Sequence, residues 1–138
     1  RGGKITWHGP GQLICYMLIN LNIRKKDIRN FLNIIENSIV KSLKVFGIES
    51  YSDRKNIGIW TNYNNEEKKI GAIGIKVKKW ITYHGFSINI NNDISSYNKI
   101  IPCGIKSKGV TTLSRIKEQS YKNLSKVLIK NLISNLKI

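Results

Sequence analysis

Cysteine, proline and long apolar stretches are all scarce in this sequence of 138 residues, which contains two cysteines and two prolines. Two cysteines cannot build the dense disulfide framework of a small secreted domain, so we expect reduced thiols in the cytoplasm. No CxxC pair is present, and the two histidines, His8 and His84, lie far apart in the chain. That spacing does not fit a zinc site, and we expect no bound metal.

Hydrophobic residues make up 41% of the chain. They never form a run near the about 20 residues that a membrane-spanning helix needs, and no signal-peptide pattern is present. From these absences we expect a cytoplasmic protein without a membrane partner. With so few prolines no linker is visible, and the length fits one domain with its own core, covering residues 1–138.

Acidic residues are scarce as well, because 8 of them stand against 24 lysines and arginines and leave a formal net charge of +16. A strongly basic chain attracts polyanions, so a nucleic-acid-binding module is one hypothesis and an acidic protein partner is another. The lysines are dispersed among asparagines and isoleucines, as an A/T-biased coding sequence would produce, and form no stripe interleaved with aromatic residues. We therefore favour dispersed compositional bias as the explanation of the charge.

Hydrophobic periodicity predicts an α+β domain. An apolar strand over 13–19 follows the glycine-rich start, and apolar residues at helical spacing predict a helix from Asp27 to Phe46, with Gly47 at its C-terminal end. A second strand is expected over 57–61. An asparagine-rich turn and two β-rich segments joined by a basic hairpin turn are expected next, over residues 63–67, 68–79 and 80–90.

The last third of the chain predicts one more helix. Residues 91–103 predict a loop or a short helix that ends at the second cysteine. After Ser120 the pattern becomes amphipathic and helical. Its apolar stripe is expected to consist of Leu124, Val127, Leu128, Ile133 and Leu136.

Four segments combine glycine with residues that can do chemistry: RGGKITWHGPGQ at 1–12, KIGAIG at 69–74, TYHGFS at 82–87 and PCGI at 102–105. Glycine lets a ligand approach the main chain closely. Taken alone, each segment is a weak signal. GAIG lacks the third glycine of a dinucleotide-binding fingerprint and the chain has no P-loop, so the sequence indicates no nucleotide cofactor.

Together, in this order and at this spacing, the four segments resemble the octanoyltransferase family of lipoate biosynthesis. Its members move an octanoyl group from acyl carrier protein to a lysine of lipoyl domains, the first step of endogenous protein lipoylation. The resemblance runs from Arg1 to about Leu113. It implies the fold of the biotin/lipoate ligase catalytic domain, a mixed β-sheet with flanking helices. Family members carry a substantial segment before the first glycine loop, so we expect that an N-terminal segment is absent here.

The resemblance also assigns roles to single residues. Cys103 matches the acyl-carrying nucleophile, and Lys69 matches the lysine that lowers the pKa of that thiol. Lys68 is an equal candidate on charge alone, and only the register against IGAIG selects Lys69. The positions that match substrate-binding residues are Arg1, Gly2, Gly3, Lys4, Ile5, Thr6, Trp7, His8, Ala72, Ile73, Gly74, Gly85, Phe86 and Ser87.

The chemistry explains why such a dyad is needed. A free cysteine has a pKa of about 8.5, and a nearby ammonium group stabilises the reactive thiolate. The thiolate attacks the donor thioester, and the same lysine protonates the departing thiol and later accepts a proton from the incoming amine. Thioester exchange is nearly balanced in energy and amide formation runs downhill, so neither ATP nor any other cofactor is expected.

An octanoyl chain also needs an apolar slot, since each buried methylene contributes about 0.8 kcal/mol. We expect that slot along the strands around Ile5, Ile73, Ile75 and Phe86. Main-chain amides in GAIG or next to Cys103 could form an oxyanion hole for the reacting carbonyl.

Other conspicuous residues are interpreted as structural. Cys15, inside an apolar run, is expected to be a small buried side chain rather than a nucleophile. Trp7 and Trp60 are expected to be packing residues. His8 and His84 are expected to orient loops or to contact substrate, since the chemistry needs no histidine base.

The resemblance implies two kinds of protein partner. They are octanoyl-acyl carrier protein, which is acidic, and the lipoyl domains of 2-oxoacid dehydrogenase complexes together with the H protein of glycine cleavage. Neither nucleic acid nor a membrane is expected as a partner, and the domain is expected to be a monomer. Two alternatives stay open: a basic nucleic-acid-binding module, and a relative that binds lipoyl domains without transferring an acyl group.

Overall fold

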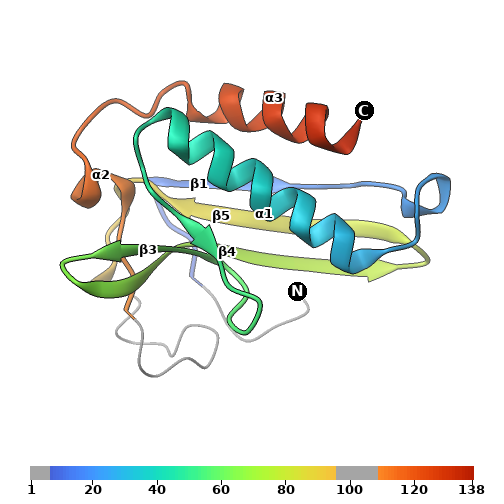
Figure 1. The fold of residues 1–138 in the computed structure, drawn as a ribbon, viewed down its shortest axis with the longest axis horizontal. Helices are drawn as coiled ribbons and strands as arrows, with labels where there is room; N and C mark the ends of the chain where they lie inside the picture. The colour runs from blue at the N-terminus through green and yellow to red at the C-terminus, as the bar shows by residue number, and fades with distance from the viewer. Residues whose placement is uncertain (1–6, 96–108) are drawn as a thin grey trace.

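One antiparallel sheet organises the part of the chain that the computed structural model describes, residues 7–95 and 109–138. Its strands are β1 (Gln12–Tyr16), β2 (Tyr51–Ser52), β3 (Ile59–Tyr63), β4 (Glu66–Lys78) and β5 (Ile81–Asn89). They lie in the order β1-β5-β4-β3-β2, and each neighbouring pair is antiparallel. The helices α1 (Ile28–Val45) and α3 (Leu124–Leu136) lie side by side across one face (Figure 1). The expected sheet with flanking helices is confirmed.

Two-residue turns join β3 to β4 and β4 to β5, at the two places where the sequence predicts turns. Asn64 and Asn65 join β3 to β4 with φ angles of 53° and 61°, and Lys79 and Trp80 join β4 to β5 with φ angles of 51° and 61°. Two central residues with positive φ match the twist of the adjoining strands. Lysine and tryptophan adopt this conformation less readily than asparagine, so the long β4–β5 pairing holds the second turn in place.

Helix α1 begins and ends within a residue of the prediction. The side chain of its N-cap, Asp27, accepts a hydrogen bond of 2.9 Å from the backbone N–H of Asn30. Gly47 follows the helix with a φ of 71°. Both features are common solutions for the unpaired groups at helix ends. The buried apolar residues of α1 are Phe31, Ile35, Ile39 and Leu43.

Helix α3 confirms the predicted C-terminal helix but not all of its apolar stripe. Its buried residues are Leu124, Leu128, Leu132 and Leu136, at every fourth position. The prediction placed Ile133 in the stripe, but its side chain is 45% exposed and Leu132 is buried instead. Val127 flanks the stripe and is half-buried. A single i, i+4 ridge packs toward α1, and this ridge turns Ile133 toward solvent.

A polar ladder links the two long helices. The side-chain amide of Asn131 donates to the hydroxyl of Ser42, and that of Asn135 donates to the hydroxyl of Ser38, each at 2.8 Å. The two serine hydroxyls in turn donate to main-chain carbonyls one turn earlier in α1. Both serines are fully buried. Because buried polar groups need partners, this ladder fixes how far α3 can slide along α1.

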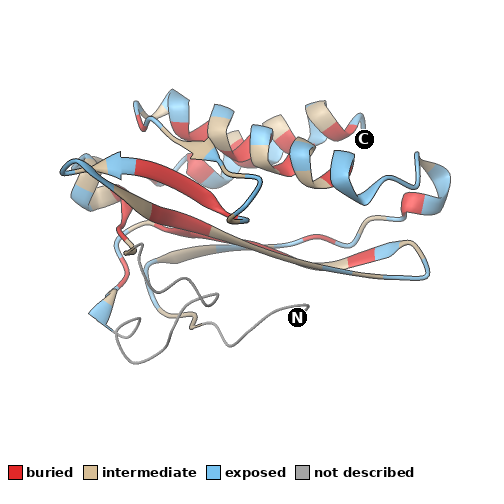
Figure 2. Ribbon diagram, turned by 60° about the horizontal axis from the view of Figure 1, so that its bottom comes forward, coloured by how far each residue is buried: buried red, intermediate tan, exposed pale blue. Residues whose placement is uncertain are grey.

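The hydrophobic core fills the space between the sheet and the two long helices, where the buried positions concentrate (Figure 2). Inward-facing strand residues such as Ile59, Ile70 and Ile88 are fully buried there. The other face of the sheet carries no helix of the described residues (Figures 1 and 2). We refer to that surface as the open face.

Three short elements were not predicted, because two to four residues are too few to show periodicity. They are β2, the 3₁₀ turn η1 (Leu21–Ile23) and α2 (Leu113–Ile116). Among the described residues, no helix combines the length and apolarity required to cross a membrane.

Candidate functional site

A β-bulge in β4 turns Lys69 onto the open face. Ile59 pairs with Gly71 and Trp60 pairs with Lys69, so Ile70 is an extra residue on β4. Ile70 is fully buried in the core beneath the helices. Side chains alternate between the faces of a strand, and one extra residue shifts that alternation. Lys69 would otherwise face the helices, as Gly71 does, but it shares the open face with Trp60.

The side chain of Lys69 is enclosed by polar and aromatic groups of the neighbouring strand. It is 7% exposed. Its Nζ donates a hydrogen bond of 3.1 Å to the carbonyl of Ile57 and lies 4.8 Å from the centre of the Trp60 ring. A Cβ atom added to Gly58 would lie 2.8 Å from Lys69 Cε and 2.9 Å from the carbonyl oxygen of Gly71, so a side chain there would crowd both the lysine stem and the main chain of β4. Together these groups form what we call the lysine socket: Ile57, Gly58 and Trp60.

The adjacent Lys68 has a different environment. Its side chain is 25% exposed and forms an ion pair with the exposed carboxylate of Glu66. The hydrogen bond and the charge of Lys68 lower the pKa of Glu66. An exposed ion pair of this kind contributes little to stability. Of the two neighbouring lysines, Lys69 is the one that is buried and enclosed, which favours the register that the sequence motif selects.

The segment that follows Cys103 in the chain is hydrogen-bonded to Lys69. The backbone N–H of Lys69 donates to the carbonyl of Gly109 at 2.9 Å, and that of Thr111 donates to the carbonyl of Lys69 at 3.0 Å. These bonds make a parallel bridge between Lys69 and Val110. Cys103 itself lies outside the described residues, six positions before Gly109 in the sequence. The backbone of the predicted lysine is therefore tied to a residue close in sequence to the predicted nucleophile.

A chain of side-chain hydrogen bonds connects the first glycine loop to the same segment. His8 Nδ1 donates to Gln12 Oε1 at 3.0 Å, and Gln12 Nε2 donates to Asn89 Oδ1 at 2.7 Å. Asn89 Nδ2 then donates to the carbonyl of Thr111 at 3.2 Å. Asn89 is only 5% exposed. Sequence reasoning missed Gln12 and Asn89, although both stand inside or next to the glycine-marked segments.

The two predicted substrate-binding triplets lie side by side. Residues 72–74 of β4 pair one to one with residues 85–87 of β5. The side chains of Ile73, Ile75 and Phe86 pack in or against the core beneath the helices. These side chains therefore face the helices and do not line the open face, and the acyl slot expected around them stays a prediction. Only the main chain of positions 73 and 86 is left to contact a ligand there.

Two paired glycines in these triplets have different reasons for being glycine. A Cβ atom on Gly85 would lie 2.0 Å from the carbonyl oxygen of Cys15, so packing of β1 against β5 forbids a side chain. A Cβ atom on Gly74 would meet nothing within 4 Å. Glycine inside a strand weakens it and often marks close approach of a ligand. Gly74 is therefore a place where the open face is kept free of side chains.

The other predicted site residues divide into described and undescribed positions. Residues 1–6 and Cys103 lie outside the described residues. Trp7 is described, and its ring lies against Gly9, where an added Cβ atom would come within 2.1 Å of the indole. His8 begins the hydrogen-bond chain described above. In the described residues, no group of three histidine, cysteine or acidic side chains is placed to hold a metal.

Cys15 behaves as the structural cysteine that the sequence predicts. It is a free thiol, half-buried, and packs against the hydrophobic core. Burial raises the pKa of the Cys15 thiol. A raised pKa leaves less of the reactive thiolate at neutral pH, so this thiol is a poor nucleophile.

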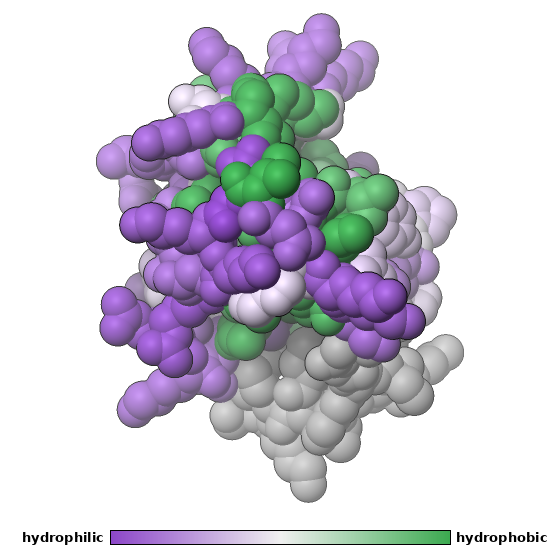
Figure 3. Space-filling model, turned by 90° about the vertical axis from the view of Figure 1, so that its right-hand side faces the viewer, coloured by the Kyte–Doolittle hydropathy of each residue, from purple (hydrophilic) through white to green (hydrophobic). Residues whose placement is uncertain are grey.

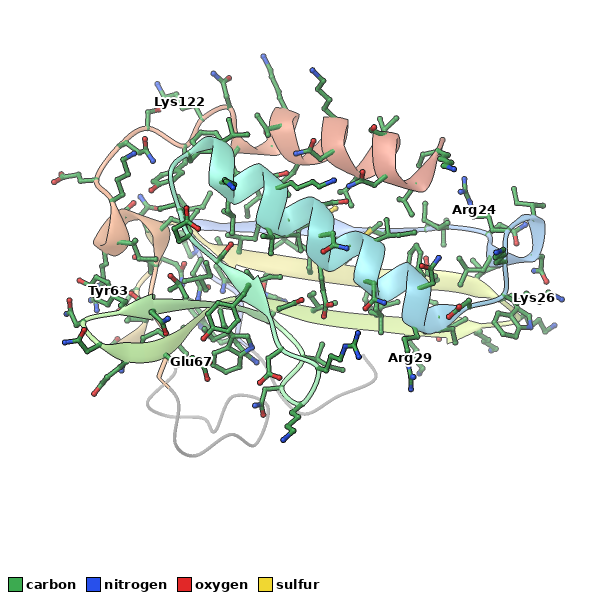
Figure 4. All side chains as sticks on the ribbon, in the orientation of Figure 1. Arg24, Lys26, Arg29, Tyr63, Glu67 and Lys122 are labelled. Atoms are coloured by element: carbon green, nitrogen blue, oxygen red, sulfur yellow. The ribbon has the colours of Figure 1, made fainter. Side chains whose placement is uncertain are left out.

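Basic side chains, all exposed except the half-buried Arg24, gather near the β4–β5 turn, at the other end of the sheet. This basic end consists of Arg24, Lys25, Lys26, Arg29, Lys76, Lys78 and Lys79, three of which are labelled in Figure 4. Apolar side chains interrupt the hydrophilic surface there (Figure 3), and Ile23 is 80% exposed. Lys78 lies nine positions along β4 from Lys69. At roughly 3.3 Å per residue this is about 30 Å, so the basic end is not part of the lysine socket.

The chain matches the model of the lipoyl protein ligase A/B catalytic domain over residues 1–133. The chain belongs to this family. Among its family relatives, an octanoyltransferase from Ehrlichia ruminantium (strain Gardel) is 51% identical over 117 residues, which are 84% of this chain and 56% of that protein. An octanoyltransferase from Rickettsia prowazekii (strain Madrid E) is 46% identical over 119 residues, 84% of this chain and 57% of that protein. The chain thus spans about half the length of these curated relatives.

Solved structures of ligases share the fold of this lipoyl protein ligase A/B domain. A bipartite lipoate protein ligase from Thermoplasma acidophilum superposes with a TM-score of 0.72 at 17% identity, covering 99% of this chain and 56% of that one. The biotin protein ligase from Aquifex aeolicus gives a TM-score of 0.69 at 22% identity, covering 92% and 53%. Identities this low speak only to the fold, and the expected biotin/lipoate ligase fold is confirmed.

Proposed function

We propose that this domain transfers an octanoyl group from an acyl carrier protein to a lysine of a lipoyl domain, through a thioester on Cys103. The observation that carries the proposal is the position of Lys69. A bulge turns it off the core face, and its backbone is hydrogen-bonded to the segment that follows Cys103. Octanoyltransferase relatives at 43–51% identity support the same reaction. Membership of the lipoyl protein ligase family favours lipoyl domains as acceptors.

The first step loads the enzyme. The Cys103 thiolate attacks the carbonyl carbon of the octanoyl thioester, a new carbon–sulfur bond forms, and the bond to the carrier sulfur breaks. The departing sulfur takes a proton, for which we assign the ammonium of Lys69 as the source. A positive charge beside the thiol favours its ionised form and so increases the fraction that can attack at neutral pH.

The second step transfers the acyl group to the acceptor. The lysine amine of the lipoyl domain attacks the thioester on Cys103, a carbon–nitrogen bond forms, and the bond to the cysteine sulfur breaks. Lys69, left neutral by the first step, accepts the proton that the amine loses. Cys103 and Lys69 return to their starting protonation states, so atoms and charges balance without a nucleotide co-substrate.

We assign the acyl group to the open face, over the paired triplets 72–74 and 85–87. Gly74 leaves that face free of a side chain at the centre of the pairing. Ala72 and Ser87 are directly paired and stand on the same side of their strands as the two glycines. Contacts from the core-facing positions between them would come from main-chain groups.

The test is the intact mass of the full chain after incubation with octanoyl-loaded acyl carrier protein. We expect the wild-type chain and Cys15→Ser to gain one octanoyl group, and Cys103→Ala to gain none. Adding a lipoyl domain should then move that group to the domain as an amide. The proposal fails if the wild-type chain stays unloaded or if Cys103→Ala loads equally well.

The same experiment separates the alternatives. A chain that binds a lipoyl domain but never gains mass would be a non-catalytic relative. A chain that gains no mass but binds DNA or RNA with steep salt dependence would be a nucleic-acid-binding module. Exposed apolar side chains such as Ile23 interrupt the basic end, so its surface gives no specific support to nucleic-acid binding.

A further inference from the structure

We propose that Trp60 is a positioning residue, which holds the ammonium of Lys69 in place and keeps it charged through the face of its ring. The inference rests on the proposed role of Lys69 and goes beyond it, because it assigns a functional role to a residue that the sequence marked only as packing. It is carried by three observations: the contact between the two side chains, the way the ring is held, and the glycine beside them.

The first observation is a buried ammonium with a specific aromatic neighbour. Lys69 is 7% exposed and Trp60 is 1% exposed, so water is largely removed from their contact. Burial disfavours a charged amine unless other groups replace its hydration. The Nζ atom lies 4.8 Å from the ring centre and 3.1 Å from the carbonyl oxygen of Ile57. Tryptophan is the best aromatic partner for a cation, and desolvation strengthens the attraction.

The second observation is that the ring is itself held rigidly. Trp60 Nε1 donates a hydrogen bond of 2.8 Å to the carbonyl of Asn56. The side chain of Asn56 in turn donates to the carboxylate of Asp53 at 2.8 Å. Trp60 faces away from the core that packs the sheet against the helices, and it does not belong to that cluster. Its burial therefore serves the open face rather than the main core.

The third observation is the space reserved for the lysine stem. Gly58 has a φ of 148°, and an added Cβ atom would lie 2.8 Å from Lys69 Cε and 2.9 Å from the carbonyl oxygen of Gly71. A glycine that precedes the strand thus allows the stem to run across β3 to the ring. The bulge at Ile70, the glycine and the ring all act on the same side chain, which a packing role for Trp60 alone does not require.

A double-mutant cycle on the full chain tests the proposal. The variants are Trp60→Leu, Trp60→Phe, Lys69→Met and the double variant of Trp60→Leu with Lys69→Met, and the readout is the octanoyl loading rate of Cys103 at saturating donor. We expect Trp60→Leu to lower that rate about tenfold, and Trp60→Phe, which keeps a ring face, to lower it less than about threefold. In the Lys69→Met background, Trp60→Leu should change the rate less than about twofold, since its target is already gone.

Trp80→Leu is the matched control. Trp80 also lies near a lysine, with Lys26 Nζ 5.6 Å from its ring, but at the basic end of the sheet. Its replacement should leave the loading rate unchanged. Thermal unfolding of every variant shows whether the domain still folds, and Trp60→Phe remains informative if Trp60→Leu does not fold.

Three results would overturn the positioning role. Trp60→Leu could slow loading by the same factor with and without Lys69, which would make its effect purely structural. Trp60→Phe could be as slow as Trp60→Leu, which would show that the ring face is not used. Finally, Lys69→Met could load octanoate at the wild-type rate. Lys69 would then have no role in loading, and Trp60 could have none through it.

A second readout separates this proposal from the proposed reaction. The alkylation rate of Cys103 by iodoacetamide, followed by peptide mass, reports the thiolate without any acyl donor. If the wild-type chain never loads octanoate but the same non-additive cycle appears in alkylation, the reaction is wrong and the positioning role stands. If loading occurs and both readouts are additive, the reaction stands and the positioning role is wrong.

Discussion

The two ends of strand β4 place lysines in opposite situations. At one end Lys69 is almost fully buried, donates to a main-chain carbonyl and faces a tryptophan ring. At the other end Lys76 and Lys78 are exposed, although Lys76 also lies near an aromatic ring, 5.8 Å from the centre of Tyr83. Figure 4 shows the separation, with Tyr63 and Glu67 labelled near the first end and Arg24 and Lys26 near the second.

The difference shows that the number of charges is a poor guide to function in this chain. The basic end holds many lysines, but water and salt screen exposed charges. An ion pair formed by an exposed lysine therefore contributes little to stability. The lysine socket holds one ammonium from which most of the water has been removed. In such a site one charge can shift the ionisation of a neighbouring group strongly. A net charge of +16 says much about solubility and little about where the chemistry takes place.

Replacing one lysine at each end gives the largest expected contrast. Lys69→Met keeps a stem of similar length and removes the charge, so we expect the loading rate of Cys103 to fall at least about 100-fold. Lys78→Met should change that rate less than twofold, since Lys78 is exposed and about 30 Å away along the strand. Single-turnover loading, followed by intact mass, measures both. Similar losses for the two variants would show that the buried lysine and the exposed lysine do not differ in function.

Breaking the hydrogen-bond chain should have an intermediate effect. In Asn89→Asp the donor to the Thr111 carbonyl is lost and a carboxylate oxygen faces that carbonyl, at a cost of about 1–3 kcal/mol. We expect loading to slow about tenfold and the midpoint of thermal unfolding to drop by about 3–10 °C. The bond from Gln12 to the Asn89 side-chain oxygen can persist in this variant.

The matched control for that variant is Asn33→Asp, at an exposed position of α1. It should alter neither loading nor thermal stability. If Asn89→Asp lowered the unfolding midpoint but left the loading rate unchanged, the chain of bonds would serve stability alone.

Neutralising the basic end should have the smallest effect. We expect the triple change of Lys76, Lys78 and Lys79 to glutamine to lower kcat/KM with an acidic carrier protein less than about threefold at low salt. The difference should vanish at about 0.3 M salt, because these charges act only through long-range attraction. Kinetics at several ionic strengths measure it. A loss above tenfold that persists in salt would place carrier docking at the basic end.

Much of the fold could be predicted from local patterns. Helix α1 combines a regular apolar stripe, an aspartate N-cap and a following glycine, and each of these is visible within a few residues. The β3–β4 and β4–β5 hairpins show the alternation and turn residues of paired strands. The stripe of α3 was harder, because choosing between Leu132 and Ile133 depends on the direction of the ridge that meets α1.

The site could be predicted only where a motif carried it. The register of IGAIG selected Lys69, but nothing local in the sequence reveals the bulge, which exists only relative to β3. The bond between Gln12 and Asn89 joins residues 77 positions apart. The role inferred for Trp60 also depends on the register between two strands. Such contacts are decided by tertiary pairing, so single-sequence patterns do not contain them.

The bulge at Ile70 has a consequence for how variants of this domain should be judged. Strand β4 carries two phases of side-chain alternation, one on each side of that residue. If the same residues paired without the bulge, Ile70 would lie opposite Trp60 and Lys69 opposite Thr61. The isoleucine and the ammonium group would then exchange faces. A chain altered in this way could retain its sheet and helices and still lack the charge on the open face. Evidence that a variant is folded is therefore no evidence that its site is assembled.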